Sequence, residues 1–479
     1  MAGTTRFTDD AAIAFDNLRD AASHLFEPTM RFGVTGLSRA GKTVFITSLV
    51  HNLLHGGRLP LFSVHSENRL KSARLAHQPD DAVPRFAYED HLDALLAGHW
   101  PQSTSSVSQL RVTIAYESAS GWSRRFGAGE LTLDIMDYPG EWLLDLPLLG
   151  KTYAEWSAEA LALSRLPNRK AIAAPWHARM GDLPETVAGD EMVARDLARH
   201  FTDYLRAGRQ DENALSILPP GRFLMPGDLE GSPALTFAPL DLARVGGELV
   251  ALMERRFEAY KTLVIRPLFR EHFARIDRQI VLVDALQAMN AGGAAVQDLE
   301  TALADILTCF NHGKPGVLSS LFSTRTDRIL FAATKADHLH HTSHDKLEAI
   351  LRRLVRRAEE RAAFSGARTD VVAMAAVRAT REASVTEGGE ELPVIVGTPQ
   401  KGETIDGQTF DGSTKTAVFP GDLPDSAGAV LDAERAAGDL NFVRFRPPKL
   451  EKTAEGVTLS LPHIRLDRAL EFLLGDKLK

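Results

Sequence analysis

Short runs of apolar residues recur along the chain and alternate with longer segments in which apolar residues return every three or four positions. The short runs are typical of strands buried on both faces, and the longer period is that of an amphipathic helix. Buried strands are expected at 30–34, 279–284, 327–333 and 370–376. Helices at 43–53 and 297–311 would follow the first and second strands. This alternation predicts an α/β fold, a mostly parallel twisted sheet with helices on both faces.

Two further segments, 109–117 and 130–137, show the period-two alternation of half-buried strands. The Ser- and Gly-containing link between them predicts an antiparallel hairpin. Its second strand would deliver Asp137 to the carboxyl edge of the sheet.

The segment after the first strand, GLSRAGKT, fits the phosphate-loop pattern G-x-x-x-x-G-K-[ST] at every fixed position. Its glycines let backbone N–H groups turn toward an anion, and the helix dipole adds to the attraction. Lys42 would hold the β- and γ-phosphates, and the Thr43 hydroxyl would bind Mg²⁺. The remaining loop residues expected to contact the nucleotide are Gly36, Ser38, Arg39, Ala40 and Gly41. A glycine-rich turn without a ligand is the alternative, and the flanking strand and helix favour phosphate binding.

Asp137 and Gly140 match D-x-x-G, in which the carboxylate supports Mg²⁺ through water and the glycine N–H meets the γ-phosphate. In many Ras-like enzymes a Gln follows this glycine and orients the attacking water. Here Glu141 stands there, which argues against rapid intrinsic hydrolysis. Glu141 either positions the water itself or is a surface acid.

Two more residues are candidates near the γ-phosphate. Thr104, in the string WPQST, is expected to sense Mg²⁺ and the γ-phosphate; a Ser/Thr-rich turn is the alternative. Arg39 is a candidate arginine finger for the nucleotide of its own or a partner subunit, with a solvent-facing side chain as the alternative.

Thr334, Lys335 and Asp337 fit [N/T]-K-x-D at the end of a predicted strand. Both carboxylate oxygens of Asp337 can accept from guanine N1–H and N2–H₂, a donor pair that adenine lacks, while Lys335 covers the base plane. After the last strand, a backbone N–H of Ala376 or Val377 would meet guanine O6.

The expected parts are an N-terminal helix packed on the core at 1–30, a discontinuous P-loop domain at 31–142 and 279–382, an inserted helical domain at 143–278, and a β-rich segment with a final helix at 383–479. The insertion is inferred from helical periods at 151–165, 186–207 and 246–264. The last part is inferred from its Gly, Asp, Thr and Pro content.

Composition excludes several classes of protein. A net charge of −8 and a pI near 6.1 argue against nucleic acid as the main partner. The early acidic residues exclude a signal peptide, and no stretch is long and apolar enough to span a membrane, so we expect a cytoplasmic protein. The histidines at 338, 340, 341 and 344 are interpreted as a solvated loop rather than a metal site.

Taken together, the strings GLSRAGKT, WPQST, DYPGEW, RPLFREHFARIDRQIVLVD and TKADHLHH resemble the bacterial YcjX family of stress-associated P-loop proteins. The resemblance covers most of the chain. It implies a cytoplasmic Ras-like protein that binds GTP and GDP and has added helical parts. It also implies a link to the stress response and to a neighbouring membrane protein, with peripheral contact at the inner membrane.

These observations leave three functional hypotheses. The first is a Mg²⁺-dependent GTPase. The second is a non-enzymatic switch whose GTP and GDP forms recruit a membrane partner, which Glu141 in place of Gln favours. The third is an ATPase, which would follow if Asp337 did not face the base.

Overall fold

The computed structural model describes residues 28–37, 39–102, 106–119, 129–210, 213–308, 326–364, 366–387, 390–405, 407–432, 440–450 and 460–479. The helix predicted within 1–30 lies almost wholly outside these residues. Within them, no helix is both long enough and apolar enough to cross a membrane.

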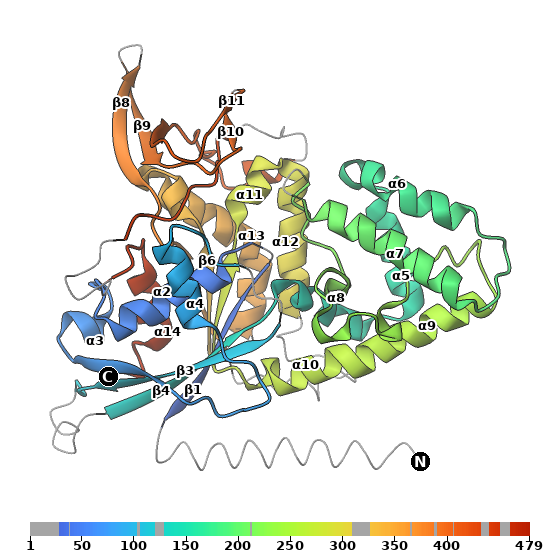
Figure 1. The fold of residues 1–479 in the computed structure, drawn as a ribbon, viewed down its shortest axis with the longest axis horizontal. Helices are drawn as coiled ribbons and strands as arrows, with labels where there is room; N and C mark the ends of the chain where they lie inside the picture. Colours follow the sequence, from blue (N-terminus) through green and yellow to red (C-terminus); the bar gives the residue numbers. More distant parts are fainter. Residues whose placement is uncertain are drawn as a thin grey trace.

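Seven strands of the described residues form one central sheet in the order β2-β3-β4-β1-β5-β6-β7 (Figure 1). They are β1 (Thr29–Gly36), β2 (Leu70–Ala76), β3 (Ser108–Tyr116), β4 (Gly129–Asp137), β5 (Arg278–Val283), β6 (Arg328–Ala333) and β7 (Arg368–Ala373). From β4 to β7 the pairing is parallel, and β3 pairs antiparallel with both β2 and β4. The predicted parallel strands and the hairpin are therefore confirmed. The edge strand β2 was not predicted.

Alternate residues of the parallel strands enter two apolar cores, as the period of a strand requires. Ile280 and Leu282 of β5 face the core shared with α2 (Lys42–Leu54) and the last helix, α14 (Leu466–Leu474). Val281 and Val283 face the opposite core, which includes α12 (Gly293–Thr308) and α13 (His344–Phe364). Helices thus cover both faces of the sheet, and the core is a Ras-like P-loop fold.

Helices occupy the chain between β4 and β5 and extend to one side of the sheet (Figure 1). We call residues 151–277 the helical insertion. It follows a 3₁₀ segment, η2 (Gly140–Gly150), and its helices are α5 (Tyr153–Ser164), α6 (Pro167–Gly181), α7 (Glu191–Gly208), α8 (Gly221–Leu224), α9 (Glu248–Tyr260) and α10 (Arg266–Glu271). Aromatic side chains from α5, α7 and α9 pack together, with Trp156 stacked on Phe257. This aromatic core is continuous with the α12/α13 side of the sheet.

The C-terminal segment, residues 383–479, contains antiparallel strands and the final helix. In its described part, β8 (Arg381–Glu387), β9 (Glu390–Gly397) and β12 (Thr416–Val418) form one small sheet, and β10 (Thr404–Ile405) pairs with β11 (Gln408–Thr409). The short helices of the core are α3 (Ser63–Ser66), α4 (Tyr88–Leu96) and α11 (Ala285–Asn290). The domain boundaries themselves stay a prediction.

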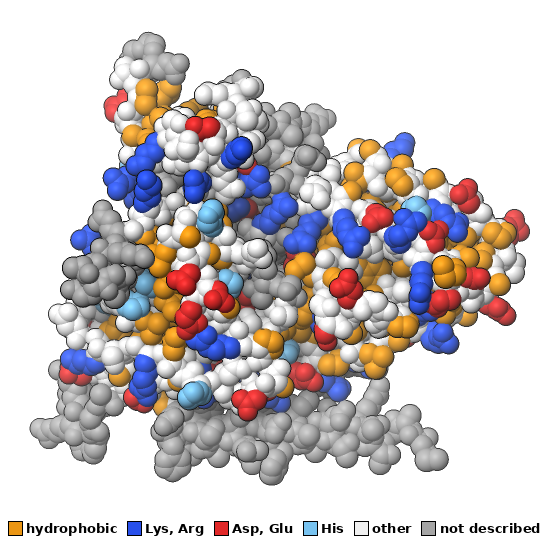
Figure 2. Space-filling view, in the orientation of Figure 1, with side chains coloured by type: hydrophobic (Ala, Val, Ile, Leu, Met, Phe, Trp, Pro, Cys, Tyr) orange, Lys and Arg blue, Asp and Glu red, His pale blue; other side chains and the backbone are white. Residues whose placement is uncertain are grey.

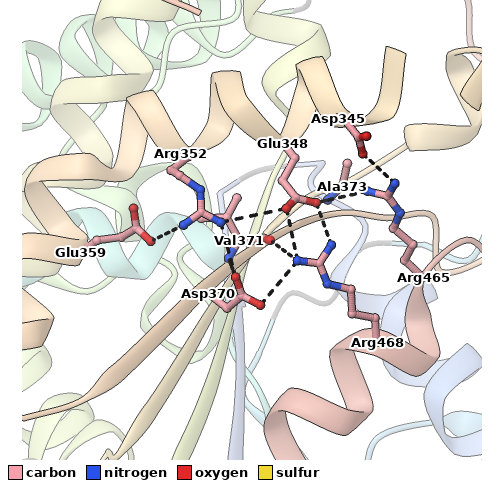
Figure 3. A network of polar contacts seen from close by, with 9 residues as sticks. All are labelled: Asp345, Glu348, Arg352, Glu359, Asp370, Val371, Ala373, Arg465 and Arg468. Atoms are coloured by element: carbon pink, nitrogen blue, oxygen red, sulfur yellow. Dashed lines mark hydrogen bonds and ion pairs between the residues drawn. The ribbon is translucent and has the colours of Figure 1, made fainter. Parts of the chain in front are cut away.

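Helix α14 packs on the central sheet rather than on the small C-terminal sheet. Its buried face includes Leu470 and Leu473. At its rim, Arg468 and Arg465 contact the carboxylate of Glu348 on α13 at 3.0 and 3.1 Å (Figure 3). The last helix therefore closes the same face of the sheet that carries the phosphate-loop helix α2.

Candidate nucleotide-binding site

The phosphate loop, Gly36–Thr43, joins β1 to α2 as the sequence predicts. Gly41 caps α2 with φ of 83°, a left-handed conformation that favours glycine. Arg39 also adopts positive φ, at 62°, which costs a residue with a side chain about 1–3 kcal/mol. The Lys42 ammonium donates to the Gly36 carbonyl at 3.0 Å and so lies over the mouth of the loop. Ser38 lies outside the described residues.

The D-x-x-G turn packs directly on the phosphate loop. A Cβ placed on Gly140 would stand 1.8 Å from the Gly36 carbonyl oxygen, so no other residue fits there without moving backbone. Asp137 is the register partner of Val34 on β1, and its side chain is buried. Thr43 is buried at the start of α2. Thr104, the other predicted Mg²⁺ contact, lies outside the described residues.

Glu141 is buried, with 5% exposure, and is therefore not a surface acid. Its carboxylate pairs with the Arg209 guanidinium at 2.6 Å. Arg209 is the C-cap residue of α7. This ion pair joins the residue after the D-x-x-G turn to the helical insertion.

The turn is anchored to the insertion at a second point, Asp145 of η2. Its carboxylate accepts from the Gly221 N–H at 2.7 Å and from the Tyr260 hydroxyl at 2.6 Å. Complete burial raises the pKa of Asp145 to about 7. Gly221 is required here, because a Cβ on it would stand 1.8 Å from the Glu141 carbonyl oxygen.

One cavity of about 260 Å³ brings the predicted phosphate and base residues together. Its lining includes, from these motifs, Arg39, Ala40, Gly41, Lys42, Thr43, Glu141, Thr334, Lys335, Asp337, Ala376 and Val377. These residues come from the carboxyl edge of the parallel strands and the loops that follow them, the usual ligand position in such sheets.

The guanine motif, Thr334–Asp337, is held by its neighbours. The Asp337 carboxylate is buried and accepts from the Ala379 N–H at 2.8 Å, which fixes its orientation. Lys335 has a left-handed backbone and its ammonium pairs with the Asp284 carboxylate. Asp337 keeps further acceptor positions for a ligand, because each carboxylate oxygen accepts more than one hydrogen bond.

Several residues that line the cavity were missed at the sequence level. Those from outside the predicted motifs include Arg209, Met225, Gln400, Arg444 and Phe445. Burial and then the positive charges of Arg209 and Arg444 lower the pKa of the Arg39 guanidinium. The insertion and the C-terminal segment thus each bring a cation toward the phosphate loop. No local sequence pattern marks these residues, because each reaches the cavity only through contacts between segments that are far apart in the sequence.

The histidines after the guanine motif do not form one solvated loop. His344 is buried, and its ring contacts the Ala336 carbonyl at 2.8 Å. His340 and His341 lie near Glu382, with ligand-type atoms of the three within 4.8 Å of one another. Glu382 also pairs with Arg378 at 3.2 Å, which makes an ion-pair cluster sufficient to explain the grouping.

Comparison with known proteins agrees with this geometry. The sequence model of the YcjX-like family, DUF463, matches residues 30–478. A protein named Ras-like GTPase YcjX from Escherichia coli (strain K12) is 37% identical over 94% of this chain and 96% of its own length. A protein of the same name from Shewanella oneidensis (strain MR-1) is 34% identical over 94% of this chain and 95% of its own.

Proposed function

From the premise that this chain belongs to the YcjX-like family, we propose that it is a Mg²⁺-dependent GTP- and GDP-binding protein that hydrolyses GTP slowly. It acts as a nucleotide-controlled switch in the stress response. The observation that carries the proposal is the single cavity lined by both the phosphate loop and the guanine motif. The relatives' names, which call them Ras-like GTPases, support it.

The residues divide the work of binding. Loop N–H groups and Lys42 hold the phosphates, and Gly140 offers its N–H to the γ-phosphate. Asp337 selects guanine, Lys335 covers the base, and Ala376 or Val377 meets O6. Asp337 faces the cavity, which favours guanine over the ATPase alternative.

The Thr43 hydroxyl and the Asp137 carboxylate suit Mg²⁺, because they are hard oxygen donors at one edge of the sheet. Thr104 completes the proposed set. When bound, the ion neutralises charge on the β- and γ-phosphates. Asp137 is carried on β4 beside the phosphate-loop strand, so the sheet itself fixes its position.

Slow hydrolysis follows from Glu141. Its carboxylate is engaged by Arg209, so it does not replace the water-orienting amide of faster relatives. The same pair favours the second candidate, a switch whose two nucleotide forms differ in how the insertion meets the D-x-x-G turn. Its partner would be a membrane protein, which it would contact at the inner membrane.

Titration of labelled GDP, GTP and ATP into the purified protein, with and without Mg²⁺, tests binding and choice of base. Guanine nucleotides should bind at least a hundredfold more tightly than ATP, because two charge-assisted hydrogen bonds of about 1.5–3 kcal/mol each are at stake. Asp337→Asn should shift preference toward xanthine nucleotides. Unchanged GTP affinity in that variant would refute the assignment of Asp337.

Single-turnover hydrolysis then separates the enzyme from the binding switch. A rate well above that of free GTP supports the GTPase. A rate equal to that of free GTP, with intact binding, leaves the switch.

A further inference from the structure

We propose that the C-terminal segment is a built-in part of the nucleotide site and that Arg444 binds the polyphosphate of the guanine nucleotide. This inference rests on the proposed function and extends it to a part of the chain with no nucleotide-binding motif. Three of its residues, Gln400, Arg444 and Phe445, line the cavity together with Lys42 and Asp337.

Two short antiparallel segments of the chain place these residues at the cavity. Pro399 bridges to Phe445 in antiparallel fashion, the Gln400 N–H donates to the Arg444 carbonyl at 2.7 Å, and the Arg446 N–H donates to Thr398 at 2.8 Å. We call residues 398–400 with 444–446 the clamp ribbon. Its backbone is fixed by paired hydrogen bonds, so its side chains present a stable wall.

The clamp ribbon is bonded to the segment that precedes Thr104. The indole N–H of Trp100 donates to the Phe445 carbonyl at 2.6 Å, and the Arg446 guanidinium donates to the Gly98 carbonyl at 3.3 Å. It also contacts the guanine motif, where the His338 ring meets the Phe445 ring edge-on at 5.3 Å. The ribbon therefore contacts both the segment 98–100 and the guanine motif.

The Arg444 side chain is held in place by Glu403. Its backbone N–H donates to one oxygen of that carboxylate at 2.8 Å, and its Nε donates to the other at 2.7 Å. The Arg444 side chain is nonetheless 54% exposed, and Glu403 is 13% exposed. The Arg444 Nη2 pairs with the same carboxylate at 2.6 Å, so the guanidinium is held at one edge while the side chain lines the cavity.

Electrostatics indicate which part of the nucleotide Arg444 reaches. It lies close enough to Arg39, inside the phosphate loop, for the two positive charges to oppose each other. The carboxylates of Asp284 and Glu141 offset part of this repulsion, and a polyanion bound between the cations would offset more of it. On the face drawn in Figure 2, Lys and Arg side chains spread from the small C-terminal sheet to the helical insertion. A di- or triphosphate is the anion that the phosphate loop is built to hold.

The test compares Arg444→Ala and Arg444→Lys with Lys401→Ala, an exposed cation of the same segment outside the cavity lining. Affinity and dissociation rate are measured with fluorescent GDP. Arg444→Ala should weaken binding at least tenfold, mainly through faster dissociation, and Arg444→Lys should recover part of the loss. Lys401→Ala should bind within twofold of the wild type.

Competition by guanosine, GMP, GDP and GTP locates the contact. The loss caused by Arg444→Ala should be absent for guanosine and grow with each added phosphate. An equal loss for guanosine would place Arg444 on the base or ribose and overturn the proposal. So would wild-type affinity in Arg444→Ala, or an equal loss in Lys401→Ala.

Two further measurements keep the outcome clear. The melting temperature of nucleotide-free Arg444→Ala should match that of the wild type; if it falls in step with affinity, the residue is structural and the proposal fails. Should Arg444→Ala not fold, the same comparison is made with Arg444→Lys, whose affinity for GDP must then fall measurably. A wild-type protein that binds no guanine nucleotide refutes the proposed function itself, a result distinct from these.

Discussion

The helical insertion and the final helix α14 both pack on the central sheet through apolar cores, but the insertion adds buried polar contacts beside the D-x-x-G turn. The insertion meets the D-x-x-G turn through buried polar groups, the Glu141–Arg209 pair and the Asp145–Tyr260 hydrogen bond. Helix α14 meets the sheet through a leucine face, Arg278 of β5 donates to its Leu473 carbonyl at 3.2 Å, and at the rim Arg468 contacts Glu348 (Figure 3).

This difference suggests separate roles for the two regions, one in the stability of the fold and one in the control of the nucleotide cycle. Apolar burial is non-directional and contributes most when nothing moves, so α14 serves to hold the fold. Buried polar pairs depend on geometry and protonation, and here they lie on the turn proposed to sense the γ-phosphate. We therefore expect changes at α14 to alter unfolding and changes at the insertion contacts to alter the nucleotide cycle.

The largest effect should come from Leu470→Ala in α14. Removing a fully buried leucine side chain leaves a cavity and costs about 2–5 kcal/mol of unfolding free energy. Urea denaturation measures this loss, with the exposed Lys477→Ala as control. Hydrolysis per folded molecule should not change. A selective loss of hydrolysis would contradict the expectation that changes at α14 affect unfolding alone.

The next effect is a pH dependence from Asp145. Its pKa is raised to about 7 in the folded protein by burial, above the value of 3.8 for an exposed carboxyl. The folded state therefore binds more protons between about pH 4 and 7, and stability falls as pH rises through this window, by up to about 1.4 kcal/mol per pH unit.

Asp145→Asn should remove this component; its amide oxygen can still accept from the Gly221 N–H, and its NH₂ group can donate to the Tyr260 hydroxyl oxygen. Denaturation at pH 5, 6, 7 and 8 measures the slope in both proteins. Parallel curves for wild type and variant would show that Asp145 does not titrate in this range.

Arg209→Ala should act on the reaction, and hydrolysis is measured per folded molecule because the change also takes a partner from the buried Glu141 carboxylate. The substitution removes from the cavity wall a cation that can stabilise charge on the transferring phosphoryl group, so we expect single-turnover hydrolysis to fall at least tenfold. GTP affinity should change less than threefold. Arg206→Ala, an exposed arginine one turn earlier on α7, is the matched control. Equal hydrolysis rates in both variants would show that the Arg209 contact of the insertion takes no part in the proposed nucleotide cycle.

The smallest effect is expected for Glu348→Gln at the rim of α14. It weakens ion pairs to Arg465 and Arg468 that are partly open to solvent, worth about 1 kcal/mol or less. Thermal unfolding at low and high salt measures it, because screening should remove most of the difference. A loss that persists in high salt would mean that packing, not charge, holds this rim.

The sequence predicted what depends on neighbours along the chain. Strands such as β5 and β6 are buried on both faces and read as continuous apolar runs. The phosphate loop and the guanine motif are local patterns, so their residues were named in advance, and the cavity joins them.

What was missed depends on contacts between distant segments. Strand β2 escaped prediction because LKSARLA is an edge strand with no fully buried residue. The sequence left Glu141 as either a water-positioning group or a surface acid, because its partner, Arg209, belongs to the insertion. The Trp100–Phe445 hydrogen bond spans 345 residues, a separation over which no periodicity in the sequence operates.

The position of β1 has a consequence for how the protein is made. The strand that carries the phosphate loop pairs on one side with β4 and on the other with β5, whose residues follow some 245 positions later. During synthesis the second edge of β1 therefore waits until the whole insertion has left the ribosome. An open apolar strand edge of this kind invites mispairing between nascent chains. Synthesis at about 5–20 residues per second makes that wait last on the order of ten seconds or more.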